Sequence, residues 1–175
     1  MKRRIVTIEE LLQSYEKGER DFAGIYLYNE DFYDYDYIDL SRINLKGAMF
    51  RDFSFFGFSN KVNFTGANLS DTGLEQQMLE GFNFSGANLS NVNLCQSTLD
   101  GSNLSKCNLS GANLKSVGLT RSNLHGVNFS RANMESVKLA GIKLTNVNLS
   151  GAINLWLDGA IFDNTIMPDG NIRTD

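Results

Sequence analysis

The sequence predicts an all-β solenoid, and three observations carry this prediction. Large apolar residues recur every five positions from Phe64 to Leu149, and all 18 positions of this series are apolar, although apolar residues make up only 42% of the chain. The residue two positions before each of them is mostly small or β-branched, as at Ala67 and Val92. The residue in between is asparagine in 12 of the 18 repeats. A period of five fits neither the 3.6-residue helix nor the 3.5-residue coiled coil, so this region is not helical.

Each repeat has the pattern of a short strand followed by a corner. In an extended segment residues two apart share a face, so Ala67 and Leu69 of GANLS point to one side and Asn68 to the other. The next two residues must turn the chain before the pattern restarts. Short strands that keep turning the same way stack into coils, with each backbone segment hydrogen-bonded to the coils above and below. The spacing alone leaves the number of sides per coil open.

The motifs GANLS, GFNFS and SGANL resemble the pentapeptide-repeat family, whose repeat is usually written A(D/N)LXX. The resemblance implies a right-handed quadrilateral β-helix with four sides and 20 residues per coil. It also implies that Leu69 and its equivalents point inward with the small residue two before them, while the other three positions face solvent. The segments GERDF and IMPDG are similar to those of cyanobacterial members of the family.

The five-residue register is interrupted at three places, near residues 37–40, 55–64 and 150–157. The series expected to point inward outside the main one are Phe22, Leu27, Phe32 and Tyr37, then Leu40, Leu45, Phe50 and Phe55, and finally Leu157, Phe162 and Met167. With the main series they give 29 repeats, hence about seven coils and a rod of roughly 34 Å. Glu30 and Gln77 fall on inward positions, and because a buried charge is costly we expect a local break of register near Glu30.

Three segments are expected: a capping helix at residues 1–18, the β-helix at 19–167 and a tail at 168–175. Thr7 and Glu10 form a capping box, apolar residues follow at helical spacing, and Gly18 supplies a stop, which predicts a short N-terminal α-helix at residues 8–17. We expect this helix to cover the first coil. At the other end the tail either folds over the last coil or leaves an edge for a homodimer, so monomer and homodimer both stay open.

Composition narrows the classes of protein. The net charge of -4 over 175 residues disfavours binding to nucleic acid. No apolar run approaches the roughly 18 residues of a membrane span, and Thr7, Glu9 and Glu10 interrupt the stretch after the basic start MKRRIV. No membrane association is therefore expected, and the expected location is cytoplasmic.

Few residues suggest chemistry, and no catalytic residue, cofactor or metal ligand is predicted. His125 follows Leu124, so it should point outward as a surface residue. Cys95 should be exposed and Cys107 inward, which disfavours a disulfide and leaves both thiols reduced. A calcium site from Asp34, Asp36 and Asp39 lacks the glycine and distal glutamate of a loop site.

One stretch stands out as a candidate partner surface, here called the aromatic–acidic surface. Its members are Tyr26, Tyr28, Tyr33, Asp34, Tyr35, Asp36 and Asp39. Residues 19–41 carry seven acids against one arginine, a net charge of -6, whereas residues 101–157 carry six bases against one acid, a net charge of +5. Exposed tyrosines and steering acids suit a protein-docking surface. The favoured interpretation is a solvated first coil whose outward tyrosines pack against the capping helix and whose acids keep a strand edge soluble.

The sequence thus predicts a non-enzymatic protein-interaction or scaffold module with an unidentified protein partner. The alternative comes from relatives in the family that mimic DNA and inhibit type II topoisomerases such as gyrase. That function needs a largely continuous acidic face, and the basic segment at residues 101–157 argues against it. An enzyme is the least supported class, because no nucleophile–base pair or metal cluster is present in the sequence.

Overall fold

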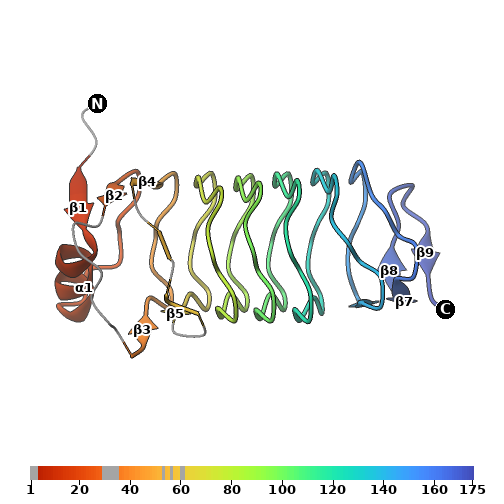
Figure 1. Cartoon of the computed structure of the whole chain (residues 1–175), viewed down its shortest axis with the longest axis horizontal. Coiled ribbons are helices and arrows are strands. Elements are labelled where there is room, and N and C mark those ends of the chain that lie inside the picture. The colour runs from red at the N-terminus through yellow and green to blue at the C-terminus, as the bar shows by residue number, and fades with distance from the viewer. Residues whose placement is uncertain (1–3, 29–35, 53, 56, 60–61) are drawn as a thin grey trace.

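The chain folds into an elongated stack of coils with its two ends at opposite ends of the stack (Figure 1). This computed structural model describes residues 4–28, 36–52, 54–55, 57–59 and 62–175. The N-terminal elements are β1 (Ile5–Thr7), α1 (Ile8–Glu16), β2 (Tyr26–Tyr28), β3 (Ile38–Asp39), β4 (Met49–Asp52) and β5 (Val62–Asn63). The C-terminal elements are β6 (Lys143–Thr145), β7 (Ile161–Asp163), β8 (Thr165–Ile166) and β9 (Ile172–Arg173).

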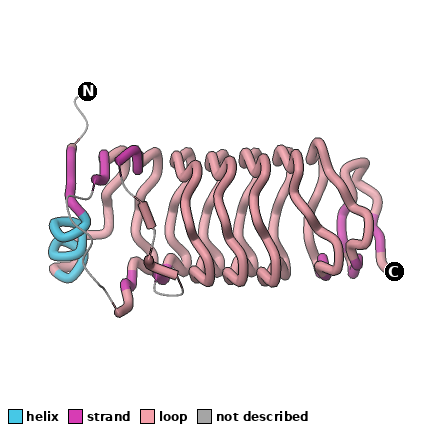
Figure 2. The backbone as a smooth tube through the Cα atoms, in the orientation of Figure 1, coloured by secondary structure: helices cyan, strands magenta, loops and turns pink. Residues whose placement is uncertain are grey.

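Parallel backbone pairing holds the coils together. Four ladders of bridges start at Asn63, Asn68, Gly73 and Met78, and each joins residues 20 positions apart. The coil therefore has four sides and 20 residues, as the resemblance implies. Each side is so short that most pairs are single bridges rather than strands, and for this reason Figure 2 draws the central coils as loops.

The core is a continuous column of apolar side chains. All 18 members of the series from Phe64 to Leu149 are buried, which confirms their inward direction. Small residues two positions earlier, such as Ala87 and Cys107, are buried beside them. Gln77 is also inward, and it is tolerated because its Oε1 accepts a hydrogen bond from the amide of Phe55 at 3.1 Å.

Left-handed residues form the corners. The residue two positions after each large apolar residue has a positive φ, for example 69° at Gly101 and 57° at Ser116. Glycine adopts this conformation without steric penalty, whereas other residues are strained by their Cβ atom. The glycines at these corner positions, such as Gly101, are therefore explained by the turn of the coil.

The asparagine of each repeat corrects one expectation from the resemblance, which placed it in solvent. Asn88 and Asn108 are half-buried, and the Nδ2 of each donates to the Oδ1 of the asparagine one coil earlier, at 3.3 and 3.2 Å. Their Oδ1 atoms also accept from the amide two residues ahead, as from Ser90 at 3.2 Å. Because the amide both donates and accepts, it can satisfy the corner and the neighbouring coil at once.

Pairing near both ends of the stack departs from the separation of 20 residues. Tyr26 pairs with Met49 and Ile38 with Val62, which are 23 and 24 positions apart, whereas Lys143 pairs with Ile161 only 18 positions away. These coils contain the stretches where the sequence predicts slips.

The structure corrects part of the expectation about which residues point inward before and after the main series. Tyr37 is 61% exposed, so its inward placement was wrong: the next residue, Ile38, takes the inward position two before Leu40. Phe162 is buried as expected, and Leu157 and Met167 pack against the core while partly buried. Phe32 and Glu30 lie outside the described residues.

Helix α1 begins where the sequence predicts. The Thr7 hydroxyl accepts from the amide of Glu10 at 3.1 Å, and the Glu10 carboxylate accepts from the amide of Thr7 at 3.0 Å, which confirms the capping box. Ile8 and Leu11 are buried with the core. The Tyr15 hydroxyl donates to the carbonyl of Ser41 at 2.7 Å, and this hydrogen bond joins the helix to a neighbouring coil.

The C-terminal end has a different architecture. Strands β6 and β7 pair in parallel, and β8 and β9 form an antiparallel pair. The Arg173 guanidinium lies 4.1 Å from the centre of the Phe162 ring.

Among the described residues, none of the helical segments has the length and the apolar character that a membrane span requires.

Candidate functional site

The structure places four of the seven members of the aromatic–acidic surface. Tyr26 and Tyr28 are half-buried on β2, in the sheet ordered β1-β2-β4, whereas Asp39 is exposed on β3, which pairs with β5. Strands β2 and β3 lie at opposite edges of the stack in Figure 1. The tyrosines and acids described here are thus carried by different sides of the coil. Tyr33, Asp34 and Tyr35 lie outside the described residues.

The two described acids of this surface have different surroundings. Asp36 is exposed. The Asp39 carboxylate accepts from the amide of Ser41 at 3.0 Å and from the Asn63 side chain at 2.9 Å. Asp39 therefore takes the structural place that asparagine has in other repeats, in addition to its negative charge.

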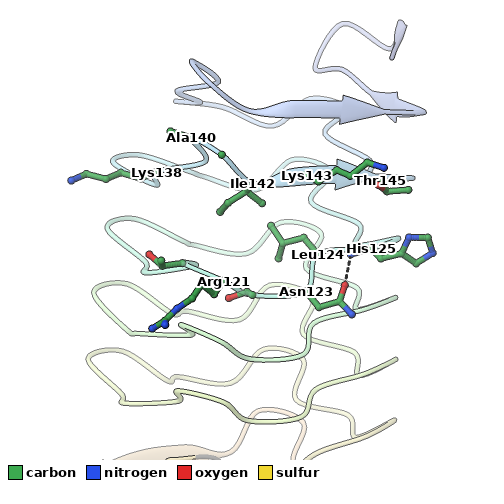
Figure 3. A pocket seen from close by; sticks show the side chains of 12 residues that line it. Arg121, Asn123, Leu124, His125, Lys138, Ala140, Ile142, Lys143 and Thr145 are labelled. Atoms are coloured by element: carbon green, nitrogen blue, oxygen red, sulfur yellow. Dashed lines mark hydrogen bonds between the residues drawn. The ribbon is translucent and has the colours of Figure 1, made fainter. Parts of the chain in front are cut away.

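A second candidate site, which sequence reasoning missed, is a cleft between two successive coils. It has a volume of about 680 Å³ and is lined by residues 120–125 of one coil and by residues between 138 and 145 of the next. Figure 3 shows the side chains of Arg121 and His125 on the first wall and those of Lys138 and Lys143 on the second. We call this space the basic cleft.

The cations of the basic cleft differ in their partners. Lys143 makes an ion pair of 2.9 Å with Asp163, and this hydrogen bond and charge hold the pKa of the Asp163 carboxyl below its ordinary value. No carboxylate of the described residues lies within ion-pair distance of Arg121 or Lys138. Both side chains are exposed, so the cleft presents uncompensated positive charge.

An apolar hollow adjoins the basic cleft. It has a volume of about 390 Å³, and Lys138 and Ala140 line both spaces. Trp156, which is 69% exposed, forms one wall of the hollow. Inside the basic cleft itself, Ile142 is only half-buried and supplies an apolar floor.

One feature of the sequence could have indicated the cleft. In the main series the residue between the small and the large apolar positions is lysine only at Lys138 and Lys143. Lys143 follows Asn103 and Asn123 in its column, whereas Lys138 follows Thr98 and Gly118. An ammonium group cannot accept hydrogen bonds, so Lys143 cannot supply the oxygen with which Asn123 accepts from the amide of His125 at 3.1 Å. The coil that carries both lysines is the one that separates from its predecessor.

The remaining chemical groups are placed as follows. His125 is exposed, as expected, and lies at the rim of the cleft. Cys107 is buried, whereas Cys95 is half-buried rather than exposed, and neither forms a disulfide. Burial raises the pKa of the Cys107 thiol to about 12. Within the described ranges, no three histidine, cysteine or acidic side chains are grouped as metal ligands.

Solved structures of several pentapeptide repeat proteins are similar to this chain. Rfr23 from the cyanobacterium Cyanothece 51142 is 26% identical with a TM-score of 0.43; the match covers 64% of this chain but only 62% of the length of Rfr23. QnrB1, a plasmid-mediated fluoroquinolone resistance protein, is 14% identical with a TM-score of 0.47, over 96% of this chain and 92% of QnrB1. HetL from Nostoc sp. strain PCC 7120, involved in heterocyst differentiation regulation, is 22% identical with a TM-score of 0.34, over 96% of this chain and all of HetL.

The family comparison rests on the sequence itself. No curated protein sequence matches the chain significantly. The family model for pentapeptide repeats matches residues 60–93, 79–115 and 114–151, with eight copies of the repeat, and these ranges together exceed half of the chain. Within these ranges, the described residues from Val62 to Asn123 form regular 20-residue coils with four ladders of bridges between them. The chain therefore belongs to the pentapeptide repeat family, whose fold is the right-handed quadrilateral β-helix.

Proposed function

We propose that this chain is a non-enzymatic protein-interaction or scaffold module that works in the cytoplasm. One observation carries the proposal: the chain combines a regular stack of coils with two regions of opposite net charge. Residues 19–41 have a net charge of -6 and residues 101–157 a net charge of +5. A solenoid of this kind offers a rigid, extended surface, and complementary charge steers and orients a partner protein.

We place one partner contact on the aromatic–acidic surface. The exposed Asp36 and Asp39 would attract a basic partner, and tyrosines supply contact area with little loss of conformational freedom. Mimicry of DNA against gyrase is less well supported, because the acidic character would have to continue along the rod. The uncompensated charges of Arg121 and Lys138 would repel a groove that binds DNA.

Two finer features of the fold belong to this proposal. Helix α1 caps a stack of about seven coils, a role supported by the burial of Leu11 with the core and by the hydrogen bond from Tyr15 to Ser41. The C-terminal end faces solvent if the protein is a monomer, or contacts a second copy of the chain if it is a homodimer. Ile153, Trp156 and Ile172 are exposed there, which supports an edge that can associate.

Affinity capture from lysate of the source cell tests the proposal. The bait proteins are wild type, a variant with Asp36→Asn and Asp39→Asn, and the control Asp158→Asn, which removes an exposed acid at the other end. Asparagine keeps an acceptor oxygen for Ser41, so the variant loses charge but not the turn. We expect a partner that binds wild type and the control but not the double variant.

The same proteins retained by all three baits would contradict the placement of this contact. A DNA supercoiling assay with gyrase tests the mimicry alternative separately. We expect no effect of the purified protein on gyrase. Inhibition that disappears in the Asp36→Asn, Asp39→Asn variant would overturn the ranking of the two functions.

A further inference from the structure

Along part of their circumference, the two coils that form the basic cleft lack the backbone hydrogen bonds that join the preceding central coils to one another. In the preceding coil the amides of Leu99, Gly101 and Leu104 donate to the carbonyls of Gly118, Thr120 and Asn123, at 2.9, 2.8 and 3.0 Å. One coil later the equivalent donors are Leu119, Arg121 and Leu124. Residues 117–145 are all described, and no backbone hydrogen bond joins residues 117–124 to residues 137–143.

The opening is confined to part of the circumference. The amide of Gly126 donates to the carbonyl of Thr145 at 2.9 Å, and that of Phe129 donates to the carbonyl of Asn148 at 2.8 Å, so the same two coils are closed on their other sides. In Figure 3 the side chains of Leu124 and Ile142 point into the space between the two segments that carry them. The coils therefore diverge as a wedge that opens outward.

The short last coil accounts for the direction of this divergence. Lys143 pairs with Ile161, 18 positions away rather than 20, and the amide of Gly141 donates to the carbonyl of Gly159 at 2.7 Å. The segment at residues 138–145 is thus bonded toward the C-terminal end. Its other edge borders the cleft, where Lys143 stands in the column in which Asn123 donates to Asn103 of the preceding coil at 3.3 Å.

The open walls define what the cleft can take. Unpaired amides and carbonyls along two parallel segments are the partners that an extended peptide uses when it adds to a sheet. A volume of about 680 Å³ lies within the usual range of binding sites, about 300–1,000 Å³. Side chains of an extended peptide alternate in direction, so one set would face the half-buried Ile142 and the other the exposed cations.

We propose that the basic cleft is a docking site for an extended acidic peptide segment of another protein. The segment inserts as a strand between residues 119–124 and 138–143 and sets its carboxylates against Arg121, Lys138 and Lys143. This goes beyond the proposed function because it names a second site and the chemistry of its ligand. Loss of the contact at Asp36 and Asp39 would leave it untouched.

Fluorescence anisotropy with defined peptides tests the proposal. The probe is a fluorescein-labelled hexapeptide of alternating glutamate and valine, and a second probe carries N-methyl groups on alternate amides, which removes donors but keeps the charge. We expect saturable binding of the first probe that weakens with salt, and binding of the N-methylated probe weaker by roughly tenfold or more. A peptide with lysine in place of glutamate should not bind.

Matched variants place the binding in the cleft. Arg121→Gln with Lys138→Gln removes two exposed, unpaired charges, and we expect it to weaken binding of the glutamate probe by roughly tenfold or more. The control Lys115→Gln removes an exposed lysine that is paired with Glu135 at 2.9 Å outside the cleft, and it should change the affinity by less than about twofold. No saturable binding, equal binding of the N-methylated probe, or equal losses in both variants would overturn the proposal.

Discussion

Truncation of Leu114 to alanine probes the packing of the solenoid directly. The side chain is fully buried, and its backbone is held by a hydrogen bond of 2.8 Å from the amide of Leu114 to the carbonyl of Asn133 in the next coil. Alanine removes three carbon atoms, worth about 2.4 kcal/mol at about 0.8 kcal/mol for each methylene. The bonded neighbouring coils limit collapse around the cavity, so a cavity contribution is added and the expected total loss is about 3–5 kcal/mol.

Denaturation in urea or guanidinium measures this loss. We expect a lower midpoint for Leu114→Ala, and a change of less than about 1 kcal/mol for the control Lys115→Ala, whose side chain is exposed. Leu114 and Lys115 are adjacent in the chain, so the comparison isolates the direction in which a side chain points. Equal midpoints for Leu114→Ala and wild type would refute the inward register of the whole series.

Three further predictions concern the corners and the thiols. Gly101→Ala should lower the free energy of unfolding by about 1 kcal/mol, because φ is 69° while its Cβ atom would meet nothing within 4 Å; an unchanged denaturation midpoint would contradict the strain argument. At pH 8 a thiol reagent should modify Cys95 and spare Cys107 in the native protein, since the pKa of the Cys107 thiol is about 12, and equal rates would show that it is accessible. Above pH 9.0 the thiol of Cys107 loses its proton in the unfolded chain but keeps it in the native state. The contribution of this buried thiol to the free energy of unfolding is therefore complete below pH 9.0 and declines toward pH 12. Relative to Cys107→Ala, wild type under reducing conditions should lose about 1.4 kcal/mol for each pH unit above that point, as followed by urea denaturation; parallel pH profiles would contradict it.

The regular part of the fold could be predicted because each repeat encodes its own geometry. A large apolar residue such as Leu114, a small one such as Ala112 and a corner residue such as Ser116 suffice to set one side of a coil. The pairing partner then follows at a separation of 20 residues. The half-buried asparagine ladder was not predicted, because the hydrogen-bond partner of each amide lies 20 residues away in the neighbouring coil.

The irregular parts depend on contacts that spacing does not encode. Tyr37 continues a five-residue series but is exposed, because Ile38 takes the inward position of that repeat. The basic cleft depends on a missing set of hydrogen bonds between coils, together with a last coil of 18 residues, and a count along one repeat reveals neither. The replacement of asparagine by Lys143, in the column of Asn103 and Asn123, is the local feature of the sequence at this place.

The candidate site was predicted less well than the fold. The aromatic–acidic surface was defined by its composition over residues 26–39, but Tyr26 and Asp39 belong to different sheets of the first coils. A short segment that turns corners distributes its side chains over several faces. Composition within such a segment therefore does not establish a common surface.

Residue-resolved amide hydrogen exchange of the free protein tests the central claim most directly, namely that successive coils from Phe64 to Asn123 are hydrogen-bonded to one another, whereas an open seam between residues 117–124 and 137–143 forms the basic cleft. The account predicts slow exchange at Leu99, Gly101 and Leu104, whose amides are bonded to the next coil, and exchange faster by at least about tenfold at Leu119, Arg121 and Leu124. Equal protection of the two sets would mean that the seam is closed in solution, and it would contradict the account.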